Sequence, residues 1–265
     1  MRKKGTPVFI LSLLLIMLLS SRFSPAREEK LLICGSTCME RLCRTLAQAY
    51  MAENPGVRIE VELGGSTMGL AGAAQGRVDL ASSSRDLTEA EQALIHAVPI
   101  AYDRIAVVVN PGNPIRSLSM GQLAAVYSGE IRDWSPLGWE GGPIVAVGRE
   151  TGSGTRTTFE QRLLGEKRPL YAQELLENGM VRTAVSITPG AIGYLSSAYL
   201  DESVRQVSVG GREGGGSTFR RAYFLGISRD GKHEAAEQFL AFALGADGQR
   251  IVRSMGYDGA GERAA

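Results

Sequence analysis

Histidine and cysteine are both scarce in this sequence of 265 residues, and their scarcity excludes several kinds of site. The two histidines, His96 and His233, stand alone and offer no metal-ligand spacing. The three cysteines, Cys34, Cys38 and Cys43, are crowded together and odd in number, so they define no disulfide framework. We therefore expect no metal site and no scaffold of disulfides.

An excess of one charge is also absent, because 29 Lys and Arg residues balance 28 Asp and Glu residues. A nucleic-acid-binding protein usually carries a clustered basic surface, so we expect no nucleic-acid partner. A small anion remains a suitable ligand, since one buried arginine suffices for it. The sequence has no Gly-x-x-x-x-Gly-Lys-Ser/Thr loop, and no Gly-x-Gly-x-x-Gly follows its first expected strand. We therefore expect no cofactor.

One long apolar run stands out, from Val8 to Leu19, and it follows the basic residues 2–4. It is short for a membrane span, which needs about 20 apolar residues. Ser24-Pro25-Ala26 beyond it has the small-x-small form of a cleavage site. We predict that residues 1–26 are a signal peptide and that the mature chain is periplasmic or otherwise extracytoplasmic. An uncleaved membrane anchor is the alternative.

The segment Leu31 to Cys34 superficially resembles a lipoprotein signal. Ile33 is large where a small residue is expected, and charged residues separate this segment from the apolar run. We therefore predict a strand here, with a lipid anchor as the alternative. Cys43 is expected in the core, while Cys34 and Cys38 are either buried thiols or reactive ones.

Strand-like and helix-like segments alternate along the mature chain, which favours an α/β fold with mainly parallel sheets. Apolar residues from Met39 to Tyr50 recur with helical spacing, and Thr88 with Glu91 has the form of a capping box. The expected strands are Leu31–Cys34, Val57–Val61, Val78–Ala81, Ile105–Val109, Ile144–Val147, Ile192–Leu195 and Ala222–Ile227.

Three turns rich in Gly, Ser and Thr each precede an expected helix: Gly35-Ser36-Thr37, Gly65-Ser66-Thr67 and Gly152-Ser153-Gly154-Thr155. The free backbone N–H groups and the dipole at a helix start attract anions, and hydroxyls add further donors. Arg149 lies four residues before Ser153, close enough to reach the same anion. The alternative is that each Ser or Thr is an ordinary helix cap. Three such turns in one chain favour a shared anion site.

These turns belong to an ordered set of motifs that resembles the phosphate-binding protein of bacterial phosphate ABC transporters. The other members of the set are Val78–Arg85, Tyr127–Trp134, Gly148–Thr155 and Pro189–Tyr194, and the resemblance covers about Leu31 to Tyr257. It implies a two-lobed periplasmic-binding-protein fold (type II-like), with the ligand between lobes. Lobe 1 would comprise residues 27–106 and 220–265, and lobe 2 would comprise residues 107–219.

The resemblance also implies the phosphate ligands. They would be Ser36, Thr37, the N–H of Cys38, Ser66, Ser84, Arg149, Ser153, Gly154 and Thr155. Ser84 stands where some members carry an Asp that accepts the phosphate proton, so the basis for rejecting sulfate is open. Glu150 would hold Arg149 in place of the acidic residue that Thr151 replaces.

The function implied is a monomeric receptor that hands inorganic phosphate to the membrane permease of an ABC importer. The alternatives are a receptor for sulfate, molybdate or tungstate, and a phosphate sensor. A phosphoesterase would need a metal cluster or an activated nucleophile, and the sequence offers neither, so we expect no catalysis. Among other residues, Asp79 and Trp134 are predicted to be structural, and Arg85 either braces its loop or touches the anion.

Overall fold

The computed structural model describes residues 28–210, 219–231 and 233–262. The predicted signal peptide, residues 1–26, lies outside the described residues, as does most of the glycine-rich stretch after Val209. Among the described residues, no helix is both long enough and apolar enough to cross a membrane.

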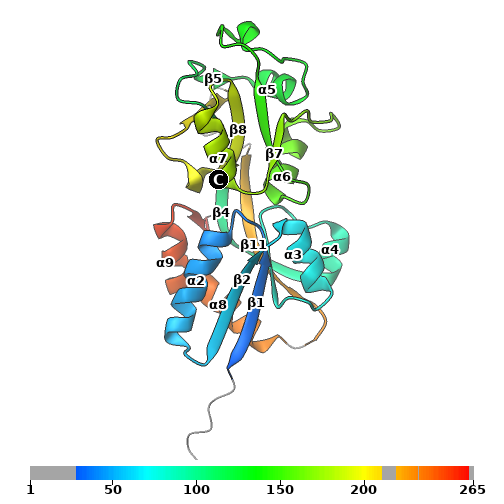
Figure 1. Cartoon of the computed structure of the whole chain (residues 1–265). Coiled ribbons are helices and arrows are strands. Elements are labelled where there is room, and N and C mark those ends of the chain that lie inside the picture. The colour runs from blue at the N-terminus through cyan, green and yellow to red at the C-terminus, as the bar shows by residue number, and fades with distance from the viewer. Residues whose placement is uncertain (1–27, 211–218, 232, 263–265) are drawn as a thin grey trace, which may run out of the picture.

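Strands and helices alternate through most of the chain, as the sequence predicts (Figure 1). The strands are β1 (Glu29–Gly35), β2 (Val57–Leu63), β3 (Leu80–Ser83), β4 (Ile95–Val109), β5 (Ser117–Leu118), β6 (Val145–Arg149), β7 (Gln173–Leu175), β8 (Ala191–Ser196), β9 (Arg205–Gln206), β10 (Ser208–Val209), β11 (Arg220–Ser228) and β12 (Asp258–Gly259). The α-helices are α2 (Glu40–Glu53), α3 (Gly65–Ala74), α4 (Glu89–Leu94), α5 (Met120–Tyr127), α6 (Gly154–Leu163), α7 (Asn178–Ile187), α8 (Glu234–Leu244) and α9 (Ala246–Ser254), with short 3-10 turns η1 (Ser135–Leu137) and η2 (Ser197–Tyr199).

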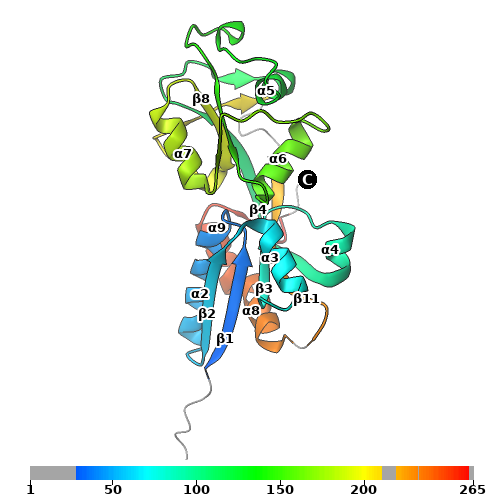
Figure 2. The ribbon, with the colours of Figure 1, turned by 45° about the vertical axis from the view of Figure 1, so that its right-hand side comes forward.

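The molecule has two lobes joined by strands, so the predicted two-lobed α/β fold is confirmed (Figures 1 and 2). The sheet order is β2-β1-β3-β11-β4-β8-β6-β7. β4 is 15 residues long and serves both lobes: up to Arg104 it pairs with β11, and from Ile105 onward it pairs with β8. β1, β2 and β3 are parallel in one lobe, as are β6, β7 and β8 in the other.

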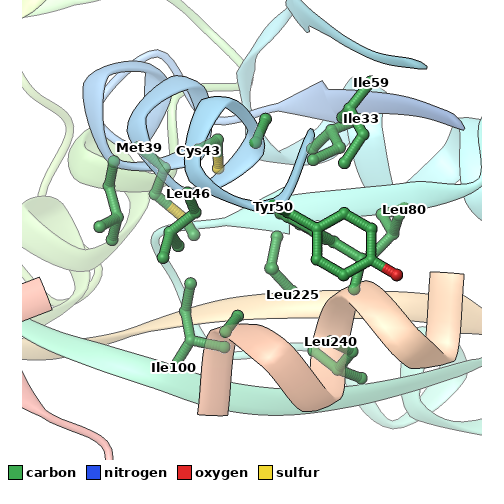
Figure 3. Close-up of a cluster of buried hydrophobic side chains, with 14 of the residues drawn as sticks. Ile33, Met39, Cys43, Leu46, Tyr50, Ile59, Leu80, Ile100, Leu225 and Leu240 are labelled. Carbon is green, nitrogen blue, oxygen red and sulfur yellow. The ribbon is translucent and has the colours of Figure 1, made fainter. Parts of the chain in front are cut away.

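Each lobe has its own core, which fixes the position of its helices. In the lower lobe of Figure 1, α2 buries Met39, Cys43 and Leu46 against β1, β11 and α8 (Figure 3). This contact confirms the helical spacing from Met39 to Tyr50 and the core position of Cys43. In the other lobe, Trp134 is fully buried and donates from Nε1 to Gly190 O at 2.9 Å, so it packs as predicted.

Two local predictions are also confirmed. Asp79 is structural, because its Oδ2 accepts the N–H of Leu32 at 2.7 Å and so ties the start of β3 to β1. Thr88 and Glu91 form the predicted capping box at the start of α4. Among the elements that the sequence patterns do not reveal are the first ten residues of β4, the whole of α7 and the short strands β5, β7, β9, β10 and β12.

Candidate functional site

The three predicted turns meet where strands of both lobes end. β1, β2 and β3 are parallel, so the turns that follow them lie along one edge of the first sheet. The turn after β6 comes from the other lobe and leads into α6. α6 lies directly above α3 in both views, and Thr67 donates its N–H to Gly152 O at 3.4 Å (Figures 1 and 2).

The first lobe contributes three hydroxyls that contact one another, and we call Ser36, Ser66 and Ser84 the serine trio. Ser36 Oγ donates to Ser84 Oγ at 2.8 Å. Ser66 Oγ lies 3.4 Å from Ser84 Oγ and accepts the N–H of Ser84 at 3.0 Å. All three side chains are buried. The trio therefore offers donors and acceptors but no formal charge.

Gly154, at the start of α6, packs directly against the serine trio. A Cβ atom at Gly154 would lie 2.3 Å from Ser66 Oγ and 2.7 Å from Ser84 Oγ, which is too close for either contact. Ser153 caps this helix, because its Oγ accepts the N–H of Arg156 at 3.4 Å. A glycine at position 154 is thus what allows the two lobes to meet here.

Arg149 supplies positive charge from the second lobe and is fully buried. Its Nη2 donates to Thr37 Oγ1 at 2.8 Å, across the lobes, and to Leu176 O at 2.6 Å. Its Nε lies 3.3 Å from Glu150 Oε2, in agreement with the predicted supporting role of Glu150. Burial raises the pKa of Glu150 even though Arg149 opposes that shift.

Cys38 lies beside Arg149, and its side chain contacts other residues of the site. Its Sγ is 2.7 Å from Thr155 Oγ1, accepts from Asn178 Nδ2 at 3.0 Å, and lies 3.6 Å from Arg149 Nη1. Cys38 comes from the first lobe, whereas these three partners come from the second. All four side chains are buried.

A second buried arginine, Arg221, is a site residue that the sequence analysis misses. Arg221 on β11 donates from Nη1 to Thr155 Oγ1 at 2.7 Å and to Ser84 O at 3.4 Å. Asp103 on β4 pairs with Arg221: its Oδ2 accepts a hydrogen bond from Arg221 Nη2 at 2.9 Å. The same oxygen accepts a hydrogen bond from Tyr223 Oη at 2.7 Å. The available signal is an acidic and a basic residue, Asp103 and Arg221, each next to the apolar part of a strand.

Arg85 does not face the serine trio, although it follows Ser84 in the chain. Its guanidinium forms two hydrogen bonds with Glu91, at 2.7 and 2.8 Å, and one with Asp86 O at 2.9 Å. The first of the two sequence alternatives therefore holds: Arg85 braces its loop. The hydrogen bond from Arg85 is the main reason that the pKa of Glu91 falls to about 2.

The predicted ligands are thus all buried and come together at the boundary of the two lobes. Ser36, Ser66, Ser84 and Gly154 meet at one point, Thr37 meets Arg149, and Cys38 meets Thr155. Ser153 lies between these groups as a helix cap. Their part in binding an anion remains a prediction. The described residues contain no group of three or more His, Cys, Asp or Glu side chains placed to hold a metal ion.

Comparisons with known proteins place this site in a family. The family model described as "PBP superfamily domain" matches residues 20–244. The phosphate-binding protein PstS of Bacillus subtilis (strain 168) is 34% identical over 202 residues, which cover 72% of this chain and 67% of that protein. PstS of Pseudomonas aeruginosa is 27% identical over 261 residues, which cover 84% of this chain and 80% of that protein.

Solved structures agree with this assignment. A phosphate ABC transporter substrate-binding protein from Clostridium perfringens, solved with bound phosphate, superposes with a TM-score of 0.82 at 31% identity. The match covers 87% of this chain and 99% of that one. An ABC-type phosphate transport receptor from Vibrio cholerae gives a TM-score of 0.73 at 30% identity, covering 86% and 99%. The chain therefore belongs to the PBP superfamily and is a relative of the phosphate-binding protein PstS.

Proposed function

We propose that the chain is an extracytoplasmic receptor that captures inorganic phosphate and delivers it to the membrane permease of an ABC importer. It binds the anion without converting it and acts as a monomer. Residues 1–26 direct export and are then removed. The names of the PstS relatives support the ligand and the transport role, and the site supports the binding chemistry.

The convergence of a buried guanidinium and buried hydroxyls from both lobes is the observation that carries this proposal. Arg149 has a full charge with no exposed surface, and within the part of the chain that the structure describes Glu150 contacts it through one oxygen, without a two-fold hydrogen bond. A buried charge of this kind is stable where an anion can complete its surroundings. The serine trio and Thr155 add neutral donors that suit the remaining oxygens of a tetrahedral anion.

We assign the ligands as the sequence analysis named them, and we assign lobe 1 to residues 27–106 and 220–265 and lobe 2 to residues 107–219. The change of partner along β4, between Arg104 and Ile105, supports this division. An anion held by Thr37 from one lobe and Arg149 from the other favours the closed form through its higher affinity for that form. The closed form is the shape that the permease would recognise.

Calorimetry on the mature chain tests the proposal directly. We expect phosphate to bind, with sulfate, molybdate and tungstate binding more weakly. Arg149→Ala is expected to lower phosphate affinity about 100-fold, since a hydrogen bond to a charged group is worth roughly 1.5–3 kcal/mol. Arg182→Ala is the matched control, because Arg182 lies in the same lobe but pairs with Asp201 at the surface.

Two results would contradict the proposal. A folded wild-type chain that gives no heat with millimolar phosphate would remove the binding function. Tighter binding of sulfate, molybdate or tungstate would assign the receptor to that anion instead. Phosphate uptake by the native host with and without the gene then separates transport from sensing, because a sensor would leave the uptake rate of an induced importer unchanged.

A further inference from the structure

The thiol of Cys38 sits among hydrogen-bond donors at the centre of the site. Asn178 Nδ2 lies 3.0 Å from Sγ, Arg149 Nη1 lies 3.6 Å from it, and Thr155 Oγ1 lies 2.7 Å from it. Cys38 is 1% exposed, so water does not replace these contacts. Cys38 and Cys43 both border the same apolar core, but only Cys38 has this set of donors from the other lobe beside its sulfur.

The orientation of each neighbour makes Sγ the acceptor. Asn178 Oδ1 accepts the backbone N–H of Ser196 at 3.1 Å, which fixes the amide with its NH2 group toward Sγ. Thr155 Oγ1 accepts from Arg221 at 2.7 Å, so its own hydrogen is free to point at Sγ. Arg149 can only donate. Three donors therefore converge on one sulfur.

The electrostatics of the site agree with this geometry. Burial acts to raise the pKa of the Cys38 thiol, but Arg221 and Arg149, with hydrogen bonds from Thr155 and Asn178, outweigh burial and bring the pKa down to about 7. Burial instead raises the pKa of Cys43 to about 12. Other titratable groups near Cys38 are tyrosines whose pKa values are raised by burial: Tyr199, Tyr223 and Tyr257. Cys38 is therefore partly a thiolate at neutral pH, and Cys43 is not.

Asp103 and Glu150, the two carboxylates at the site, each pair with an arginine, although Glu150 Oε2 makes no hydrogen bond with the described residues. Asp103 accepts from Arg221, Tyr223 and Ser197. Glu150 contacts the Nε edge of Arg149, whereas Cys38 contacts the Nη1 atom. Ser84, at the position where an acidic residue would accept a proton, carries only a hydroxyl. Among the described residues of the site, Sγ is thus the anionic acceptor that faces the proposed phosphate ligands Arg149 and Thr155.

We propose that Cys38 Sγ accepts a hydrogen bond from the hydroxyl group of singly protonated phosphate, and that it thereby sets the preference of this site for oxyanions that carry a proton. This inference rests on the proposed phosphate-binding function. Phosphate at neutral pH retains at least one proton, whereas sulfate has none. Sulfate would place a bare, negatively charged oxygen against the thiolate with no proton between them, and this repulsion disfavours sulfate.

The ratio of phosphate to sulfate affinity tests the inference in Cys38→Ala, Cys38→Ser and the control Cys43→Ala. In the wild type we expect phosphate to bind at least about 100-fold more tightly than sulfate. Cys38→Ala is expected to lose about tenfold in phosphate affinity and nothing in sulfate affinity, so that the ratio falls. Cys38→Ser should recover part of the ratio, because a hydroxyl can accept. Cys43→Ala should leave the ratio unchanged.

A second measurement uses the intact site, in case a Cys38 variant does not fold. Ultraviolet absorbance should reveal a thiolate in the phosphate-saturated wild type near neutral pH. The same thiolate absorbance should be present in Cys43→Ala. Absence of that thiolate would overturn the inference, as would equal loss of phosphate and sulfate binding in Cys38→Ala, which would mean that Cys38 only packs. A wild type that binds no phosphate at all would instead remove the proposed function, and the inference with it.

Discussion

The two lobes bring different chemistry to the same site, and their arginines make the difference clear. In the first lobe Arg85 pairs with Glu91 at 2.7 and 2.8 Å. Arg221 pairs with Asp103 at 2.9 Å, so that a carboxylate balances each of these charges. Arg149 in the second lobe is buried at the site and bonds mainly to neutral oxygens. The first-lobe arginines are thus paired with carboxylates, whereas we propose that the charge of Arg149 serves the ligand.

Because of this difference between the lobes, Arg149 mainly sets how strongly an anion is attracted, and the serine trio mainly sets which arrangement of oxygens fits. A guanidinium attracts any small anion, whereas hydroxyls fixed by one another at 2.8 and 3.4 Å accept only oxygens at particular positions. Since Arg149 and the serine trio belong to different lobes, neither lobe alone has the complete proposed site. Tight binding therefore requires the lobes to be together, which couples affinity to lobe closure.

The largest expected effect comes from removing the contribution of one lobe. Phosphate should reduce the radius of gyration of the wild type in solution scattering and raise its melting temperature with concentration. Arg149→Ala should abolish both effects at phosphate concentrations that saturate the wild type. Thr37→Val with Ser66→Ala should only weaken them, by about 30-fold in the concentration required, because neutral hydrogen bonds are each worth about 1 kcal/mol.

Compaction that survives in Arg149→Ala but is lost in the Thr37→Val, Ser66→Ala double variant would reverse the comparison. The charge would then contribute less to closure than the hydroxyls do. Arg182→Ala again serves as the control, and its scattering curve should match that of the wild type with and without phosphate.

A smaller effect is expected where the lobes touch. Gly154→Ala places a Cβ atom within 2.3 Å of Ser66 Oγ, so that either the trio or the helix must shift. We expect phosphate affinity to fall roughly tenfold, as for one or two lost hydrogen bonds, with little change in the melting temperature of the ligand-free protein. Gly179→Ala on α7 is the matched control, since its Cβ would meet nothing within 4 Å. Equal phosphate affinity for both variants would mean that the lobes need not make this contact in order to bind.

Local patterns predicted much of this architecture. Alternation, helix starts and turn residues indicated the α/β fold, Ser36, Ser66 and Arg149, because each of these depends on neighbours within a few residues, whereas Ser84 was named through the family resemblance. The partners of Arg221 could not be predicted in the same way. Asp103 lies 118 positions before it, and only the antiparallel pairing of β4 with β11 brings the two together.

The first part of β4 escaped prediction for a related reason. Between Ile95 and Arg104 the strand contains His96, Pro99 and Asp103, which interrupt the apolar pattern expected of a buried strand. Pairing with β11 on one side and contact with β12 on the other supply the stability that local propensity lacks. The role of Cys38 likewise depends on Asn178 and Thr155, from distant segments of the chain.

The smallest expected effect concerns the arginine that the ligand does not use. Glu91→Gln keeps the capping box with Thr88 but removes the charge that holds Arg85. The folded-state pKa of Glu91 is about 2, below its ordinary 4.5, so its ionised form stabilises the fold above pH 4.5, and this contribution disappears as the pH falls toward 2. Because the pair is partly exposed and screened by solvent, we expect the variant to lose only about 1 kcal/mol in its free energy of unfolding at neutral pH.

Denaturant titrations should show this difference in unfolding free energy disappearing in acid. Glu60→Gln, whose partner Arg58 is exposed, should show no such difference at any pH. Phosphate affinity should be unchanged in both variants, because Arg85 turns away from the serine trio. A tenfold change in the phosphate affinity of Glu91→Gln would place Arg85 in the site and remove the contrast between the two lobes.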